Sequence, residues 1–149
     1  GVVNSYGSSS IVTILFSGEK RMKSEECIFC QEKTLNRIVM EVGSVYAIED
    51  RYPVTPGHHL IVPIRHAEDF FTMTSIERQD ADTCLFRLRR MLMDKDPTIT
   101  GFNIGINCGE AAGQAIFHAH IHLIPRRKGD AKEPLGGIRG AVPERMKHL

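Results

Sequence analysis

The sequence predicts an α+β fold, in which an antiparallel sheet of five strands packs against one long helix and one short helix. Two observations lead to this fold class. Five short apolar segments bounded by Gly, Pro or Asn are typical of strands, and short connections make neighbouring strands antiparallel. One long segment between the third and fourth strands repeats its apolar residues at helical spacing. The order of hairpin, strand, helix and strand pair belongs to the α+β class.

The composition is that of one globular domain. The chain has 149 residues, of which 42% are hydrophobic and 25% charged, and these values exclude a disordered chain, a coiled coil and a collagen-like fibre. Residues 1–21 are expected to be an N-terminal extension or a cloning remnant, in which residues 11–16 can add an edge strand. Residues 22–149 are expected to form a single domain with a basic C-terminal tail.

Charge and cysteine content narrow the function classes. The net charge of +1 excludes a polycation that binds nucleic acid directly. The segment after Pro125 holds a local surplus of Lys and Arg, suited to an anionic ligand or to a solvated tail. Four cysteines are too few for a secreted disulfide scaffold, and no apolar run reaches the roughly 18 residues of a membrane span. We therefore expect a cytoplasmic protein without a membrane partner.

The first strands and turns are predicted from local signals. Residues 37–41 and 45–49 form a predicted hairpin that turns at Gly43 and Ser44. A loop that contains two prolines and a glycine separates this hairpin from a third strand at residues 58–63. A short helical turn is expected at residues 67–71.

The long helix has a clear beginning in the sequence. Thr74 and Glu77 fit a capping box, with Thr74 as the N-cap residue and Glu77 at position N3. The helix is expected to end near Asp94. The fourth and fifth strands are predicted at residues 101–107 and 116–124. The helical residues expected to face the core are Ala81, Cys84, Leu85, Leu88, Met91 and Leu92.

The fifth predicted strand carries three histidines at alternate positions. Because alternate residues of a strand share a face, His118, His120 and His122 are expected to project to one side of the sheet. At ~3.3 Å per residue, the outer two lie roughly 13 Å apart, which makes one ion shared by all three difficult, whereas two of the three can share a metal. The set more naturally divides the work among a ligand or structural group, a nucleophile or base, and a hydrogen-bonding group or proton donor.

The loop before these histidines suits an anion. Gly113 permits a close backbone approach, and the main-chain N–H groups of Gln114 and Ala115 can point at an oxyanion. The side-chain amides of Gln114 and Asn107 are further donors. Together with the histidines, this loop indicates phosphate chemistry in which an imidazole forms a labile phosphoramidate that water then splits.

The segment from His118 to Ile124 resembles the signature of the histidine triad (HIT) family, His-x-His-x-His followed by two apolar residues. The resemblance continues through two upstream blocks that end at His58 and His66, Pro-Gly-His and Pro-Ile-Arg-His, and covers roughly residues 26–127. It implies an antiparallel sheet with a long helix, a homodimer, and nucleotide binding with hydrolysis or transfer at the α-phosphate.

The resemblance also implies roles for individual residues. His120 matches the nucleophile, and His122 and His58 match the histidines that contact and orient the phosphate. The phosphate cradle is matched by Asn107, Gly113, Gln114 and Ala115. The residue that accepts from the ribose hydroxyls is matched by Asp50, and the apolar base pocket is matched by Ile28, Phe29 and Ile48. Ala115 departs from the Ser or Thr of many relatives. His122 distinguishes the chain from the uridylyltransferase-like branch, which has Gln there.

Cys27 and Cys30 form a Cys-x-x-Cys pair, which is half of a tetrahedral zinc site. Some bacterial members of the resembled family complete such a site with two histidines, which here are His66 and His118. Four protein ligands leave no open position, so this zinc would be structural. A redox pair or two buried thiols are the alternatives for the cysteines.

The resemblance therefore implies a nucleotide hydrolase that acts through a nucleotidyl–His120 intermediate. Its expected substrates are dinucleoside polyphosphates or nucleoside phosphoramidates, and transfer of the nucleotidyl group to phosphate is a close variant. Two other classes stay open. One is a non-catalytic nucleotide-binding interaction module, and the other is a zinc hydrolase in which the triad itself ligates the metal.

Overall fold

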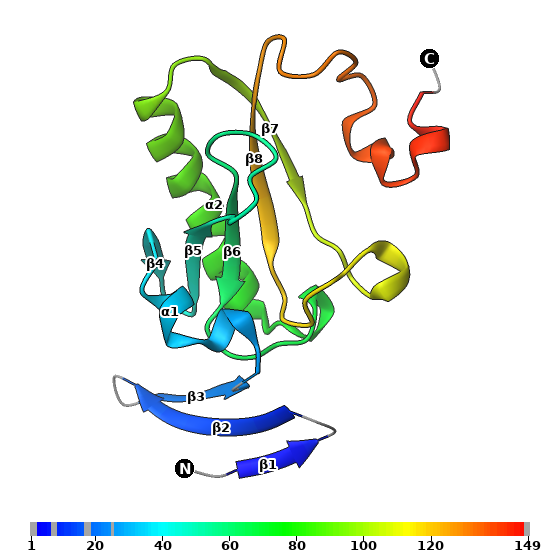
Figure 1. Ribbon diagram of the computed structural model, residues 1–149. Coiled ribbons are helices and arrows are strands. Elements are labelled where there is room, and N and C mark those ends of the chain that lie inside the picture. The colour runs from blue at the N-terminus through cyan, green and yellow to red at the C-terminus, as the bar shows by residue number, and fades with distance from the viewer. Residues whose placement is uncertain (1–2, 7–8, 17–18, 25, 148–149) are drawn as a thin grey trace.

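The structure is a computed structural model that describes residues 3–6, 9–16, 19–24 and 26–147. Its centre is a five-stranded antiparallel sheet in the order β4-β5-β6-β8-β7. The long helix α2 (Ser75–Lys95) covers one face of this sheet (Figure 1), and α1 (Glu32–Leu35) is the short helix. The predicted α+β class is confirmed. The strands are β4 (Met40–Val42), β5 (Val45–Glu49), β6 (His59–Pro63), β7 (Ile99–Gly105) and β8 (Ile121–Arg127).

The N-terminal strands form a sheet of their own. It has the order β1-β2-β3, with β1 at Val3–Tyr6, β2 at Ser9–Phe16 and β3 at Glu19–Ser24. Residues 11–16, predicted to add an edge strand, do form a strand, but within the described residues it pairs only with β1 and β3. The strand is therefore not an edge of the five-stranded sheet. Short connections make local antiparallel pairing available on both sides of β2, and the apolar pattern does not distinguish this from pairing with a distant sheet.

Local signals fix the turn of the hairpin and the start of the helix where the sequence predicts them, but the first strand of the hairpin is β4 (Met40–Val42) and not residues 37–41. Gly43 turns the chain with φ +54°, a conformation that favours glycine. The main-chain N–H and hydroxyl of Ser44 donate to the Asp80 carboxylate of α2 at 2.9 and 2.7 Å. The capping box is confirmed, because the Thr74 hydroxyl accepts from the Glu77 N–H at 3.1 Å and the Glu77 carboxylate accepts from the Thr74 N–H at 2.8 Å.

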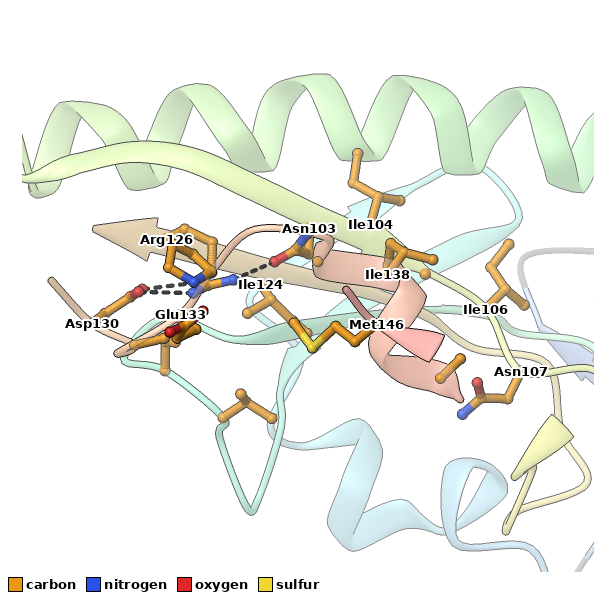
Figure 2. Close-up of a pocket in the computed structure, with 17 residues that line it drawn as sticks. Asn103, Ile104, Ile106, Asn107, Ile124, Arg126, Asp130, Glu133, Ile138 and Met146 are labelled. Carbon is orange, nitrogen blue, oxygen red and sulfur yellow. Dashed lines mark hydrogen bonds and ion pairs between the residues drawn. The ribbon is translucent and has the colours of Figure 1, made fainter. Parts of the chain in front are cut away.

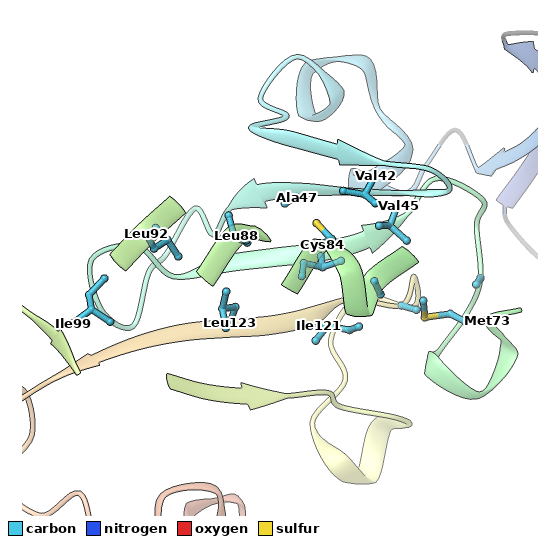
Figure 3. Close-up of a cluster of buried hydrophobic side chains, with 14 residues drawn as sticks. Val42, Val45, Ala47, Met73, Cys84, Leu88, Leu92, Ile99, Ile121 and Leu123 are labelled. Carbon is cyan, nitrogen blue, oxygen red and sulfur yellow. The ribbon is translucent and has the colours of Figure 1, made fainter. Parts of the chain in front are cut away.

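The main core lies between α2 and the sheet, as Figure 3 shows. The helical residues that the periodicity predicts pack there, and Cys84 and Leu88 are fully buried. Burial raises the pKa of the Cys84 thiol to about 11, which agrees with an inert apolar role. The opposite face of the sheet carries a second cluster, in which Phe29 packs against residues of β5 and β6: Tyr46, Ile48, Leu60 and Val62.

The last strand begins later than predicted. The sequence predicts a strand at residues 116–124, but β8 starts at Ile121, and the preceding residues form an irregular segment. The Ala119 N–H donates to the carbonyl of Ala67 at 2.7 Å, so this segment is held by the loop after β6 and not by a strand ladder. Of the three histidines only His122 lies in the strand. The prediction that all three project from one strand face is therefore wrong.

The C-terminal segment follows β8 through two 3₁₀ turns, η4 (Gly137–Ala141) and η5 (Pro143–Arg145), and η4 lies against β7. Two basic side chains at and after the end of β8 have internal partners. Arg127, the last residue of β8, pairs with Asp96 at 2.8 Å, and Lys147 of the C-terminal segment pairs with Glu133 at 2.9 Å. Within the described part of the chain, no helix is both long enough and apolar enough to cross a membrane.

Candidate functional site

A cavity of about 190 Å³ opens between the 3₁₀ turn η1 (Ile28–Cys30), the end of β5 and the histidine segment. Its lining includes Ile28, Phe29 and Ile48, the residues predicted for a base pocket. Asp50 and His120 line the same cavity. The fold thus brings together the predicted base-pocket residues, the predicted ribose acceptor and the predicted nucleophile from separate segments of the chain.

Sequence reasoning does not single out every residue of this cavity. Leu60 could have been predicted as a lining residue, because it lies two residues after His58 in the third predicted strand and so shares its face. Tyr52 lies in a loop without periodicity, and its main-chain N–H donates to the Asp50 carboxylate at 2.8 Å. The lining residues missed are Thr34, Arg37, Glu49, Arg51, Tyr52, Leu60 and Ile116.

The ring of His120 is held with one nitrogen free. Its Nδ1 lies 2.8 Å from the carbonyl oxygen of His118. A carbonyl only accepts, so Nδ1–H donates and Nε2 carries the lone pair. Burial lowers the pKa of His120, which keeps the ring neutral at pH 7. The ring of Phe29 packs beside it, with the two centroids 5.1 Å apart. The site therefore presents an unprotonated imidazole nitrogen beside the cavity, as a nucleophile requires.

His58 and His122 form a hydrogen-bonded relay. The Val54 N–H donates to His58 Nδ1 at 3.0 Å, so neutral His58 carries its proton on Nε2. His58 Nε2 lies 2.9 Å from His122 Nδ1 and donates to it, which leaves the proton of His122 on its own Nε2. The Asp50 carboxylate lies 3.5 Å from His58 Nε2. The relay thus fixes His122 as an N–H donor.

Burial keeps both relay rings neutral. It lowers the pKa of His58 despite the nearby Asp50 carboxylate. Burial, together with the neighbouring imidazoles of His120 and His58, lowers the pKa of His122 to about 4. At neutral pH the relay therefore donates through an uncharged N–H group.

A fall in pH from about 6.5 to 4 is expected to destabilise the protein through His122. An unfolded histidine titrates near ~6.5, whereas folding lowers the pKa of His122 to about 4. Between these values the unfolded state binds more protons, so stability is lost as the pH falls. Urea unfolding at a series of pH values tests this. The His122→Asn variant should show a shallower loss than the wild type, and equal losses would contradict the expectation.

Asp50, His58 and His122 also place possible ligand atoms within 4.8 Å of one another. Metal binding through His58 Nε2 would require its proton to move to Nδ1, where it would oppose the Val54 N–H that now donates there at 3.0 Å. The hydrogen bonds of this cluster therefore fit a relay better than an ion. Among the described residues, no such cluster contains more than one triad histidine, which argues against a metal held by the triad.

A second cluster fits zinc. Cys27, Cys30, His66 and His118 offer ligand atoms within 4.8 Å of one another. The Nδ1 of His118 lies 3.4 and 3.5 Å from the two sulfurs and 3.1 Å from Nδ1 of His66. Tetrahedral Zn–S bonds of ~2.3 Å and Zn–N bonds of ~2.0 Å place sulfur and nitrogen roughly 3.5 Å apart. The four residues therefore match a tetrahedral Cys₂His₂ site.

The protonation of His118 and Cys27 leaves their ligand atoms available to a metal ion. His118 Nε2 donates to the carbonyl of Pro63 at 2.7 Å, which leaves the lone pair on Nδ1, the nitrogen that faces the cysteines. Such an outer hydrogen bond orients a ligating imidazole. The hydrogen bond with Cys30 and the contacts with both histidines hold the pKa of the Cys27 thiol far below its ordinary value, in favour of the thiolate that zinc binds.

The side chain of Gln114 holds the loop before the histidines. Its Oε1 accepts from the Gly109 N–H at 2.8 Å, and its Nε2 donates to the carbonyls of Glu68 and Ile116 at 2.8 and 3.1 Å. Both amide protons are therefore used within the protein. The sequence predicts that this amide donates to a ligand, but the structure assigns it to the loop.

The predicted main-chain donors differ in availability. The Gly113 N–H donates to Glu110 at 2.9 Å, and the Gln114 N–H donates to Gly109 at 3.1 Å. Ala115 is exposed, and its N–H has no acceptor within the described part of the chain. Of these three groups, the N–H of Ala115 is the one that remains for a phosphate.

Asn107, the last predicted cradle residue, lies just beyond β7. It is exposed and lines a second, larger cavity. The structure therefore does not place Asn107 in the lining of the 190 Å³ cavity.

The sequence of this chain is similar to those of known proteins. A profile of the HIT domain matches residues 31–129. AP-4-A phosphorylase of Mycobacterium tuberculosis is 36% identical over 89 residues, which cover 58% of this chain and 45% of that protein. Bis(5'-nucleosyl)-tetraphosphatase (asymmetrical) of Schizosaccharomyces pombe is 36% identical over 81 residues, covering 54% and 44%. The chain thus spans less than half the length of these two relatives.

A solved structure resembles the fold as well. It is that of a Zn-bound histidine triad family protein from Mycobacterium smegmatis, with a TM-score of 0.65, 31% identity, and coverage of 72% of this chain and 80% of that one. The matched HIT profile covers more than half of this chain and contains all three histidines of the signature. On these grounds the chain belongs to the HIT family.

Proposed function

We propose that this protein is a nucleotide hydrolase that cleaves at the α-phosphate of dinucleoside polyphosphates or nucleoside phosphoramidates. The observation that carries this proposal is the free Nε2 of His120, fixed by the 2.8 Å hydrogen bond from Nδ1 to the His118 carbonyl beside an apolar cavity. The names of the two relatives, an AP-4-A phosphorylase and a bis(5'-nucleosyl)-tetraphosphatase, support the same substrate class.

In the first step the lone pair of His120 Nε2 attacks the α-phosphorus. An N–P bond forms, the bond to the leaving group breaks, and the leaving group keeps the electron pair; an amine leaving group also takes up one proton from solvent. The ring then carries positive charge, which the His118 carbonyl stabilises by accepting from Nδ1–H. The Nε2–H of His122 and the N–H of Ala115 donate to the phosphate oxygens.

In the second step water attacks the phosphorus and the N–P bond breaks. The electron pair returns to His120 Nε2, the nucleoside monophosphate leaves, and the remaining proton of water passes to solvent. Phe29 and Ile48 hold the base, while the Asp50 carboxylate accepts from the ribose hydroxyls. Inorganic phosphate in place of water would make the same intermediate a phosphorylase.

Zinc has a structural role in this proposal. The bound ion would join Cys27 and Cys30 to His66 and His118 and leave no open coordination position. Its effect on the chemistry would be indirect. His118 would bind the ion through Nδ1, and the main-chain carbonyl of the same residue orients the ring of His120.

Two further properties belong to the proposal. We propose a cytoplasmic homodimer, supported by the family resemblance and by β7, which lies at the edge of the five-stranded sheet. We also propose that residues 22–149 are the functional domain and that residues 1–21 are an extension, with the boundary inside β3 (Glu19–Ser24). Light scattering of the full chain tests the homodimer, and turnover by residues 22–149 alone tests the assignment of the functional domain.

Product analysis tests the proposed activity. Diadenosine tetraphosphate is expected to give AMP and ATP, and adenosine 5'-phosphoramidate is expected to give AMP and ammonia. ADP formed from the first substrate in the presence of phosphate would identify transfer to phosphate. Binding of AMP without turnover of either substrate would contradict the proposal and favour a non-catalytic nucleotide-binding module.

A further inference from the structure

A second cavity, of about 680 Å³, lies between the β7–β8 part of the sheet and the C-terminal segment. Figure 2 shows Ile138 and Met146 of that segment facing Asn103 and Ile124 of the sheet. Its volume falls within the roughly 300–1,000 Å³ typical of small-molecule sites. The chemistry described above does not use this cavity.

The cavity begins beside β8, the strand that carries His122. On β8, His122 and Ile124 share one face because they alternate along the strand. Their partners on β7 are Gly105, opposite His122, and Asn103, opposite Ile124. Gly105, Asn103 and Ile124 all line the cavity. A Cβ added at Gly105 would lie 3.6 Å from Cδ1 of Ile138, so the C-terminal segment packs directly over the partner of His122.

One loop is a wall of both cavities. Asp50 and Tyr52 line the base pocket, whereas Val54 and Thr55 line the larger cavity. The Val54 N–H also donates to His58 Nδ1 at 3.0 Å, so a residue that lines the larger cavity is hydrogen-bonded to the first histidine of the relay. The loop is anchored to the sheet where the Thr55 hydroxyl donates to the carbonyl of Pro125 at 2.6 Å. The two cavities therefore lie on the two sides of the same loop and relay.

The lining of the larger cavity suits an uncharged group, because its charged side chains pair within the protein: Asp130 with Arg126, and Glu133 with Lys147 at 2.9 Å. Its only cation among the described lining residues, Arg126, donates to the Asp130 carboxylate at 2.8 and 2.9 Å and to the Asn103 side chain at 2.7 Å. No cation of the lining is therefore left for a phosphate. Apolar side chains and amides make up most of the rest, among them Ile104, Ile106, Ile138, Met146 and Asn107.

We infer that the cavity under the C-terminal segment binds the second nucleoside of a dinucleoside polyphosphate, the half that departs with the leaving group. This inference rests on the proposed hydrolase activity and narrows its substrate class. One nucleotide occupies the base pocket, its α-phosphate lies at His120, and the polyphosphate passes His122 toward Gly105. A phosphoramidate with a small amine leaves the larger cavity empty and gains nothing from it.

Replacing Ile138 with asparagine tests this inference. Ile138 is 60% exposed, so the substitution is compatible with the fold, and asparagine removes apolar contact without adding charge. We expect kcat/KM for diadenosine tetraphosphate to fall roughly tenfold, while kcat/KM for adenosine 5'-phosphoramidate stays within about twofold. Val142→Asn is the matched control, because Val142 lies in the same segment with 54% exposure but does not line the cavity. The control should change neither value.

The outcomes separate the inference from the proposed function. A selective loss for diadenosine tetraphosphate in Ile138→Asn supports a site for the leaving nucleoside. Turnover of both substrates with equal losses, or with no loss, overturns the inference and leaves the hydrolase proposal intact. Failure of the wild type to turn over either substrate overturns the proposed function, and the inference with it.

Discussion

The His120→Asn variant is expected to lose turnover of diadenosine tetraphosphate by about 10⁴-fold or more while binding AMP within a few fold of the wild type. Asparagine can still donate to the His118 carbonyl, which now accepts from Nδ1 at 2.8 Å. It has no basic nitrogen with which to attack phosphorus. The base pocket, formed by Ile28, Phe29 and Ile48, stays in place. Steady-state rates and calorimetric titration with AMP provide the two measurements.

His59→Asn is the matched control for this experiment. His59 lies in β6, is buried, and donates through Nδ1 to the carbonyl of Gly57 at 2.6 Å, and it lines neither cavity. We expect its kcat to stay near the wild-type value. Turnover by His120→Asn at a rate close to that of the control would contradict a nucleophilic role for His120.

Removal of zinc is expected to lower both the stability and the affinity for AMP. A ligand present at a thousandfold excess over its Kd stabilises the folded state by about 4 kcal/mol, and we expect chelation to lower the free energy of unfolding by an amount of this order. The base pocket is affected because Ile28 and Phe29 lie between Cys27 and Cys30, the proposed zinc ligands, on one short turn. We expect a loss of AMP affinity of roughly tenfold, or about 1.4 kcal/mol.

Thermal unfolding and calorimetric titration with AMP, before and after chelation, test this prediction. By thermodynamic linkage, AMP should raise the zinc affinity by the factor by which zinc raises the AMP affinity. Cys30→Ser should reproduce the effect of chelation, whereas Cys108→Ser, outside the cluster, should not. An unchanged melting temperature and unchanged AMP affinity after zinc removal would rule out the structural role. Loss of the chemical step with both properties intact would favour a catalytic zinc.

Local signals made most of the fold predictable. The turn at Gly43, the capping box at Thr74 and the apolar spacing of α2 are properties of neighbouring residues, and each is confirmed. The strand predicted at residues 116–124 was not fixed in this way. Alternating histidines imitate the period of a strand, but the segment before Ile121 is held by contacts with distant residues.

The site was predictable to a different extent. The signature and its upstream blocks pointed to the residues now gathered at the cysteine cluster and the base pocket. Two features could not be predicted. One is that the side-chain amide of Gln114 donates within the protein and not to a ligand. This depends on the position of the Glu68 carbonyl, which is far away in sequence. The larger cavity depends on how a segment without periodicity folds back over β7.

A crystal structure of the protein with bound AMP tests the central claim most directly. We predict that Nε2 of His120 faces the α-phosphorus, with Phe29 and Ile48 against the base and Asp50 at the ribose hydroxyls. A complex in which the His120 ring turns away from the phosphate, or in which the three triad rings surround one ion, would contradict the nucleophilic role of His120.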